Sequence, residues 1–311
     1  MNNNRFLHPH RRSIVLTTMT TLTALLMSAG LAGCGSDTSQ VSKETTVSPF
    51  DQDLHDRLPA DIRAAGVVRV GTDASYAPAS FFAPDGRTIV GFEPDLAAAM
   101  AKVLGVRFKV VNVDFTEALP LVAEHEIDAV MSAMNDTTER QEQADFVDYF
   151  AAGTAILVQQ GNPRGISDLG GLCGKMVAVE VGTVQVDMLA RAQPGCAGQR
   201  IDVSTFPTNS DALLQLRTGR VDAVLNDYPP AVYTTTDART RRHFQLASTT
   251  QYEPGLYGIA VAKDQQQLRD VLSDTVTDLI RSGTYADVLH RWSVSDGAVA
   301  EVTINAGGTP G

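Results

Sequence analysis

Two short stretches, Glu126-Ile-Asp-Ala-Val130 and Arg220-Val-Asp-Ala-Val224, repeat nearly the same phrase at two places in the chain. Each follows an amphipathic segment and a turn, and each ends in a short apolar run typical of a buried strand. Because the same local arrangement occurs twice, the sequence indicates two lobes that are built alike.

Outward from these phrases, short apolar runs alternate with amphipathic segments in two blocks, which predicts an α/β fold with mostly parallel strands flanked by helices. The first block predicts strands at 67–70, 108–113 and 129–131 and helices at 95–104 and 117–124. The second predicts strands at 176–181, 201–205 and 223–225 and helices at 185–192 and 210–218.

Two apolar extended runs, 154–159 and 257–262, connect the blocks, and helical patterns follow at 265–281 and 284–292. We expect the chain to cross to the second lobe at the first run and to return at the second. The two crossover strands then form a hinge, with a ligand-binding cleft between the lobes.

The expected division of the whole chain follows from these patterns. It is a signal peptide at 1–33, a flexible tether at 34–60, lobe I at 61–153, lobe II at 154–250, the completion of lobe I at 251–295 and a C-terminal tail at 296–311.

The N-terminal segment follows different rules from the rest. Three arginines and no acidic residue precede an uncharged stretch that ends Leu31-Ala-Gly-Cys34. This ending resembles the lipobox of bacterial lipoproteins, in which the cysteine becomes the lipid-bearing N-terminus; the alternative is a chance cysteine after a leader. We expect an exported protein, anchored through Cys34 to the outer face of the bacterial cell membrane.

The composition argues against a nucleic-acid partner. The 311 residues carry 25 Lys and Arg against 36 Asp and Glu, a net charge of -11, and no basic run interrupts the body of the chain. With 43% hydrophobic residues the chain can build real cores.

Cys173 and Cys196 form an even pair in an exported, oxidising context, which favours a disulfide. Two buried free thiols, or a metal site, are the alternatives. No histidine lies at ligand spacing near either cysteine, so we expect no metal and no cofactor.

Polar and aromatic residues follow the predicted strands at the ends where such sheets bind ligands. They are Asp73, Tyr76, Phe115, Ser132, Ala133, Asn135, Arg140, Glu180, Thr183, Val184 and Asp227. Taken singly, the carboxylates are compatible with turns or helix caps, the rings with a core and Arg140 with a solvated helix. Their convergence on one cleft favours a binding site.

Six phrases in order resemble the family 3 extracellular solute-binding proteins, the amino-acid receptors of ABC importers. The phrases are Gly71-Thr-Asp-Ala-Ser-Tyr-Ala-Pro78, Val90-Gly-Phe-Glu-Pro-Asp-Leu96, Thr137-Thr-Glu-Arg140, Gly174-Lys-Met-Val-Ala-Val-Glu-Val-Gly-Thr183, Gly219-Arg-Val-Asp-Ala-Val224 and Ser282-Gly-Thr-Tyr-Ala-Asp287. The resemblance runs from about residue 67 to 292. It implies a two-lobe periplasmic-binding-protein fold, a monomer, and ABC permease subunits in the membrane as partners.

The resemblance also implies roles for the candidate residues. Arg140 would bind the ligand carboxylate with backbone N–H groups near Thr183 and Val184. Asp227 would bind the ammonium. The resemblance also implies that the rings of Tyr76 and Phe115 lie on either side of the ligand side chain, and that Asp73 contacts the far end of that side chain. The residues that it implies for the floor of the site are Ser132, Ala133 and Asn135.

Two departures from the family pattern bear on the ligand. Val184 stands where many relatives carry a hydroxyl, and Glu180 stands where glutamine-binding relatives tend to carry a lysine. With Asp73, Glu180 would make the pocket acidic and favour arginine, lysine or ornithine; glutamine or another neutral polar amino acid is the alternative.

An enzyme on the same scaffold, a dehydratase with Glu180 or Asp73 as general acid, is a further alternative, and so is a sensory role through a partner. The scattered histidines offer no Ser-His or Cys-His arrangement, so we expect a receptor and not an enzyme.

Overall fold

The computed structural model describes residues 49–308. The expected signal peptide, residues 34–48 of the expected tether and the lipid-bearing Cys34 lie outside the described residues.

A single curved sheet runs through the described part of the chain, with the strand order β5-β1-β6-β12-β7-β10-β8-β9 and with β11 and β13 also paired to β7. Its strands are β1 (Val67–Thr72), β5 (Arg107–Asn112), β6 (Ala129–Val130), β7 (Ala144–Gln159), β8 (Met176–Glu180), β9 (Asp202–Phe206), β10 (Ala223–Asp227), β11 (Phe244–Leu246), β12 (Tyr252–Ala262) and β13 (Ala298–Ile304). A small second sheet contains β2 (Ser75–Tyr76), β3 (Ser80–Phe82) and β4 (Ile89–Val90).

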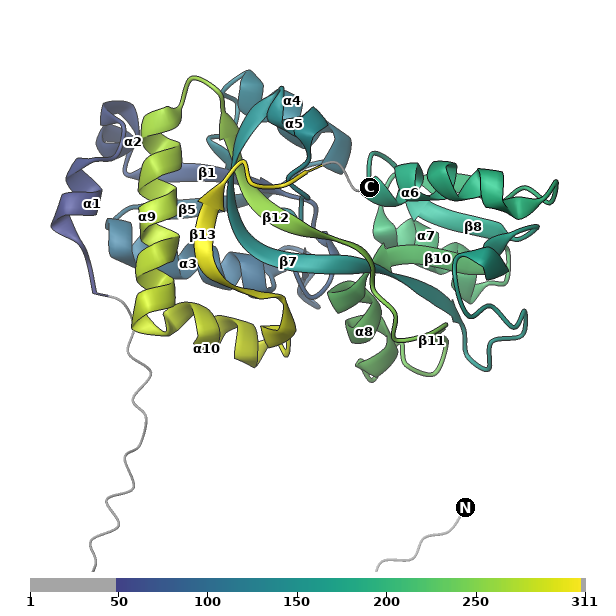
Figure 1. The fold of residues 1–311 in the computed structure, drawn as a ribbon. Helices are drawn as coiled ribbons and strands as arrows, with labels where there is room; N and C mark the ends of the chain where they lie inside the picture. The colour runs from purple at the N-terminus through teal and green to yellow at the C-terminus, as the bar shows by residue number, and fades with distance from the viewer. Residues whose placement is uncertain (1–48, 309–311) are drawn as a thin grey trace, which may run out of the picture. The chain divides into compact units, whose positions relative to one another are not determined.

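Helices cover the sheet in both halves (Figure 1). They are α1 (Gln52–Asp56), α2 (Ala60–Ala65), α3 (Phe92–Leu104), α4 (Ala118–Ala123), α5 (Thr138–Gln141), α6 (Val184–Ala192), α7 (Asn209–Arg217), α8 (Tyr228–Thr236), α9 (Gln266–Ser282) and α10 (Thr284–Arg291). The helices and strands of both sequence blocks are confirmed, with boundaries that move by a few residues.

The two lobes have separate apolar cores, which confirms the two-lobe α/β fold. In lobe I, α3, α9 and α10 bury residues such as Met100, Leu272 and Leu289 against the sheet. In lobe II, β8 and α6 bury Val177 and Leu189 in a core of their own.

Two long antiparallel strands, β7 and β12, connect the lobes and lie side by side (Figure 1). The first half of β7 pairs with the end of β12 in lobe I, and its second half, from Thr154 to Val158, pairs with β10 in lobe II. The crossover expected at 154–159 is therefore the second half of a strand that begins at Ala144. The earlier half was missed because Asp145 and Asp148 interrupt its apolar pattern, although both are buried.

Two expected boundaries are corrected by the structure. The tether does not extend to residue 60, because α1 begins at Gln52 and Leu54 and Leu58 are buried in the core of lobe I. Part of the expected tail is β13, which pairs with β7 at Phe150, Asp148 and Val147 and so adds a strand to lobe I.

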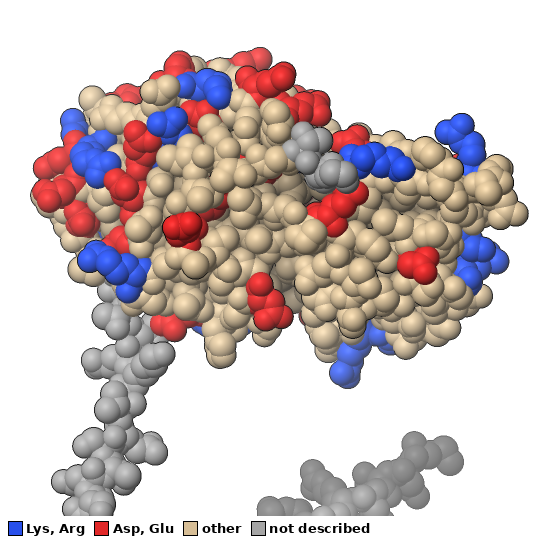
Figure 2. Space-filling view, in the orientation of Figure 1, with Lys and Arg blue, Asp and Glu red and all other residues tan. Residues whose placement is uncertain are grey.

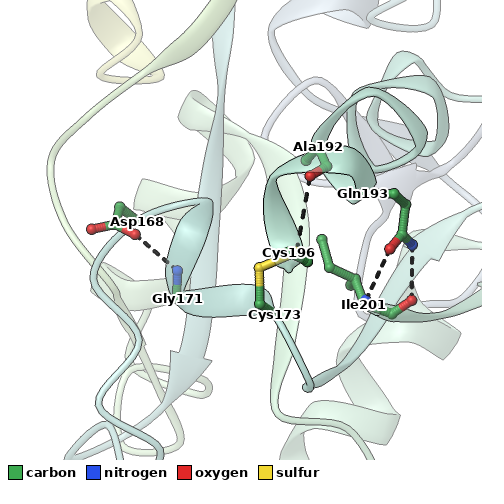
Figure 3. The surroundings of a disulfide bond; sticks show 7 residues. All are labelled: Asp168, Gly171, Cys173, Ala192, Gln193, Cys196 and Ile201. Carbon is green, nitrogen blue, oxygen red and sulfur yellow. Dashed lines mark hydrogen bonds between the residues drawn. A yellow bond between two sulfur atoms is a disulfide. The ribbon is translucent and has the colours of Figure 1, made fainter. Parts of the chain in front are cut away.

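The expected disulfide joins Cys173 to Cys196 in lobe II, with Cα atoms 5.2 Å apart and a separation of 23 positions in sequence (Figure 3). Beside it, the Gln193 side chain donates to and accepts from the backbone of Ile201. The disulfide therefore fixes the segment between α6 and β9, away from the strand ends that face the other lobe.

On the face shown in Figure 2, acidic and basic side chains are interspersed and the basic ones form no extended patch. Within residues 49–308, no helix has both the length and the apolar character that crossing a bilayer requires.

Candidate ligand-binding site

A cavity lies between the lobes. Its lining consists of Asp73, Tyr76, Phe115, Ser132, Ala133, Asn135, Arg140, Glu180, Thr183, Gln185 and Asp227. Every site residue expected from the sequence is present except Val184.

Strand direction brings these residues together. In lobe I, β1 is parallel to β6, so Asp73 and Ser132 follow carboxyl ends at the same edge. In lobe II, β8 is parallel to β10, so Glu180 and Asp227 end neighbouring strands. Such edges are where open α/β sheets bind ligands.

Arg140 is the cationic side chain of the lining. Its Nη1 donates to the Asn135 carbonyl at 2.7 Å and its Nη2 to the Gly182 carbonyl at 2.9 Å, so it links lobe I to lobe II. The guanidinium carbon lies 5.4 Å from the centre of the Phe115 ring, within cation-π range. Burial lowers the pKa of Arg140 to about 10, which leaves it charged at neutral pH.

Asp227 is a buried carboxylate held from both lobes. Its Oδ2 accepts from the Tyr76 hydroxyl at 3.0 Å, and its Oδ1 accepts from Gln185 Nε2 at 2.7 Å. Burial raises the pKa of Asp227 to about 6, while the Tyr257, Tyr76 and Gln185 side chains and then Arg140 act to lower it.

Asp73 and Glu180 contribute the other two carboxyl groups, one from each lobe. Asp73 Oδ1 accepts from the Ser75 N–H at 2.8 Å. Asp73 Oδ2 and Glu180 Oε1 are buried, and no N–H or O–H donor of another described residue reaches them. The two carboxyl groups are close enough to share a hydrogen bond when one of them is protonated. Burial, and next the neighbouring Asp73 carboxyl, raises the pKa of Glu180 to about 10.

The start of α6 closes one side of the cavity. Thr183 precedes the helix and donates its hydroxyl to the Glu180 carbonyl at 2.8 Å. Gly182 has φ +77°, and a Cβ there would lie 2.9 Å from Thr116 Cγ2, so both its conformation and the close approach of the lobes require glycine.

Val184 is the exception among the expected residues. It lines two outer hollows beside the cavity and not the cavity itself. Neighbouring residues on a helix point in different directions, so Thr183 faces the cavity while the side chain that follows turns outward.

Sequence reasoning missed two residues that shape the site. Gln185 lines the cavity and also donates to the Thr154 hydroxyl. Glu93, buried at the start of α3, accepts from the Ala133 N–H at 2.6 Å and from the Ser80 hydroxyl at 2.7 Å. Ala133 has φ +47°, so this bond holds an unfavourable backbone conformation in the cavity floor.

A signal for both residues was present in the sequence. Gln185 is a polar residue in the first turn of the helix that opens at Gly182, and Glu93 is an acidic residue beside apolar Phe92. From the sequence alone, neither position can be identified as buried, because polar residues in the first turn of a helix are also common at the surface.

No cluster of three or more histidine, cysteine or acidic side chains in residues 49–308 is arranged to hold a metal ion. The lining of the cavity contains one guanidinium, that of Arg140, and three carboxyl groups. Such a site can bind a zwitterion whose side chain ends in hydrogen-bond donors.

The family model of the bacterial extracellular solute-binding proteins, family 3, matches residues 68–295. The L-cystine-binding protein TcyJ of Escherichia coli is 28% identical over 237 residues, which is 76% of this chain and 85% of that protein. The arginine-binding protein ArgT of Corynebacterium glutamicum is 28% identical over 252 residues, 80% of this chain and 81% of that protein.

Two solved structures are similar over most of their length. An ancestral arginine-binding protein bound to glutamine has 33% identity and a TM-score of 0.67, with 74% of this chain and 98% of that one covered. An ancestral amino acid-binding protein described as a precursor of cyclohexadienyl dehydratase has 31% identity and a TM-score of 0.67, with 75% and 97% covered.

Proposed function

The chain belongs to the bacterial extracellular solute-binding proteins of family 3, and from this premise we propose that it captures a polar amino acid between its lobes and delivers it to the permease of an ABC importer. The relatives named above are amino-acid-binding proteins by name. The observation that carries the proposal is the cavity between the lobes, where Arg140 stands against three buried carboxyl groups.

Each end of an amino acid has a counterpart in this cavity. Arg140 binds the ligand carboxylate with its remaining donors, and Asp227 binds the ammonium. The ligand side chain lies between the rings of Tyr76 and Phe115 and ends at Asp73. Thr183 supports the carboxylate from the start of α6, and Ser132, Ala133 and Asn135 form the floor.

The favoured ligand is a basic amino acid such as arginine, lysine or ornithine. The support is the pair of buried carboxyl oxygens on Asp73 and Glu180 that lack partners, because an unpartnered buried acceptor is costly and a cationic donor relieves it. Glutamine, or another neutral polar amino acid, is the alternative ligand.

Capture works by lobe closure. The bonds from Arg140 to Gly182 and from Tyr76 to Asp227 join the lobes in the described arrangement. Between the lobes, β12 carries two irregularities in its pairing with β7, one on each side of the stretch from Gly255 to Tyr257. Bending there opens the cleft, and a ligand that contacts both lobes shifts the equilibrium toward the closed form.

Delivery to the permease follows from the proposed export and anchoring. Lipid on Cys34 holds the receptor at the outer face of the cell membrane, and the closed form docks on the permease subunits as a monomer. The acidic balance of the chain leaves lipid, and not charge, as the means of membrane attachment.

The first test is calorimetric titration of the purified protein, freed of carried-over ligand by unfolding and refolding. The panel is the twenty amino acids with ornithine and citrulline. We expect one tight ligand per chain, with arginine, lysine or ornithine at the head of the panel, and recovery of that ligand chemically unchanged.

Arg140→Met is the matched variant for this titration, because methionine keeps much of the side-chain length and removes the charge. We expect it to weaken binding by about 10²–10³-fold, the cost of about 3–4 kcal/mol for breaking a buried charge pair. No binding across the panel contradicts the receptor role, and conversion of the ligand to a product supports the dehydratase alternative.

A further inference from the structure

Two carboxyl groups from opposite lobes meet in the cavity without a cation between them. Asp73 follows β1 in lobe I, and Glu180 ends β8 in lobe II; both are at least nine-tenths buried and both line the cavity. Each keeps one side-chain oxygen, Oδ2 on Asp73 and Oε1 on Glu180, that no described donor reaches.

The other charged and titratable groups of the cavity are already engaged. Arg140 is directed to the carbonyl oxygens of Asn135 and Gly182. Asp227 accepts from Tyr76 and Gln185, and it is a third negative group and not a counterion. Nothing in the lining therefore neutralises two ionised carboxylates at the far end.

Two buried carboxyl groups that face each other do not both ionise in a site of low dielectric, because the two negative charges repel each other. The pKa of Glu180, raised to about 10 by burial first and by Asp73 next, agrees with a pair that keeps one proton at neutral pH. Tyr76 and Tyr257, whose pKa values are raised well above the usual range by burial, stay neutral beside it.

We propose that the Asp73–Glu180 pair holds one proton in the absence of ligand, and that the cationic end of a bound amino acid displaces it to solvent. This inference rests on the proposed function and specifies its coupling to pH. In the exchange, the Glu180 carboxylic acid loses its proton to bulk buffer, and the resulting carboxylate pairs with the guanidinium or ammonium of the ligand. Charge balances, because one positive charge enters as another leaves.

The exchange separates two ligand classes. A guanidinium offers several N–H donors to the two free oxygens and brings the charge that expels the proton. A neutral amide or urea also offers donors, but it brings no charge, so the proton stays on the pair. Affinity for a cationic side chain then rises with pH by up to about tenfold per unit, because one proton is released per ligand.

Arginine and citrulline are matched ligands for the test, because the second replaces a guanidinium by a neutral urea of nearly the same shape. We would titrate the purified protein with each at pH 7.5 in phosphate and in Tris, which differ in ionisation enthalpy. The difference in observed heat between the buffers gives the number of protons released. We expect about one for arginine and none for citrulline.

Glu180→Gln is the decisive variant, with Glu124→Gln on the exposed surface of lobe I as its control. We expect Glu180→Gln to bind arginine with no proton release and no tenfold-per-unit pH dependence, while the control behaves like the unchanged protein. Because glutamine keeps the side-chain length and acceptor oxygen, the cavity retains its shape, and a thermal unfolding scan verifies folding.

The failures of the two proposals are distinguishable. Arginine binding without proton release, equal release for arginine and citrulline, or release that persists in Glu180→Gln overturns the exchange and leaves the receptor role intact. Absence of binding by every amino acid in the panel overturns both.

Discussion

Two pairs of buried carboxyl groups within residues 49–308 differ in the hydrogen-bond donors that the chain supplies around them. One is Asp73–Glu180 in the cavity, where each member keeps an oxygen without a partner. The other is Asp136–Asp148 beneath the C-terminal segment 303–307, which we name the C-terminal strap. Asp136 Oδ2 accepts from the Gly307 N–H at 2.7 Å, and Asp148 Oδ2 accepts from the Thr303 hydroxyl at 2.8 Å.

The strap lies beyond the segment that the family model matches, which ends at residue 295. It also supplies the Ala306 N–H to Asp148 at 3.2 Å, and the Gly307 carbonyl accepts from Gln141, the neighbour of Arg140. A Cβ at Gly307 would lie 2.1 Å from the Asp136 carbonyl oxygen, so the contact requires glycine.

Buried carboxyl groups therefore contribute to stability beneath the strap and to ligand binding in the cavity. Beneath the strap the chain donates to Oδ2 of both carboxyl groups, which offsets part of the cost of burial and fixes the segment, although Asp148 Oδ1 has no partner. At the Asp73–Glu180 pair the chain supplies no donor to one oxygen of each group, so a ligand that brings donors lowers the cost of burying them. The predictions below test that division between the two pairs.

The largest expected effect comes from Asp73→Asn in the cavity pair. We expect arginine affinity to fall by about 10²-fold, because a buried ion pair with the ligand is lost at a cost of roughly 3 kcal/mol. Citrulline affinity should change by much less. The free energy of unfolding without ligand should not fall, because a buried negative charge is removed and the asparagine Oδ1 still accepts from the Ser75 N–H. Calorimetry and urea unfolding measure the two quantities.

Asp136→Asn is the matched variant in the strap pair. We expect it to lower the free energy of unfolding, because the charged acceptor of the Gly307 N–H is lost. The ratio of arginine affinity to citrulline affinity should stay unchanged. A changed ratio would show that the two carboxyl pairs do not have separate roles.

Removal of residues 306–311 tests the strap with β13 left in place. Asp136 and Asp148 each lose a backbone donor, so we expect the free energy of unfolding to fall by about 2 kcal/mol. Urea unfolding measures the loss. Replacement of Gln52, which donates to Asp56 on the exposed α1, by alanine is the control and should change stability by less than about 0.5 kcal/mol. An equal fall in the free energy of unfolding for the deletion and for the control would mean that the strap does not stabilise the fold.

Asp148→Asn is tested through the slope of stability against pH, where the expected change is at most about 1.4 kcal/mol per pH unit. Burial, opposed by the Thr303 bond and reinforced by Asp136, raises the pKa of Asp148 to about 7. Because its unfolded pKa is near 4, the folded state holds the extra proton between about pH 4 and 7. Its contribution to stability is full below pH 4 and is lost as pH rises to 7, by up to about 1.4 kcal/mol per unit.

The asparagine variant should remove that loss, so its unfolding free energy should fall less steeply from pH 4 to 7. Unfolding in urea at several pH values gives the two slopes. Parallel curves for the variant and the unchanged protein would contradict a raised pKa at this position.

The sequence predicted the alternation of strands and helices because both blocks carry clear periodicity. It predicted that the polar residues after the strands lie together because strand ends in such sheets converge. It did not predict β13, whose partner β7 lies about 150 positions away in the chain and leaves no local signal. The sequence did not show that the Gln185 side chain lines the cavity while that of Val184 lies outside it, because the start of α6 was clear but the direction of each side chain about the helix was not.

The central claim is that a ligand held by both lobes keeps them closed, and small-angle X-ray scattering tests it most directly. The purified, ligand-free protein is measured with and without saturating arginine, and calorimetry on the same sample verifies saturation. The account predicts a smaller radius of gyration with arginine, and no change in Arg140→Met at the same concentration. An unchanged scattering profile for the saturated, unmodified protein would contradict capture by lobe closure.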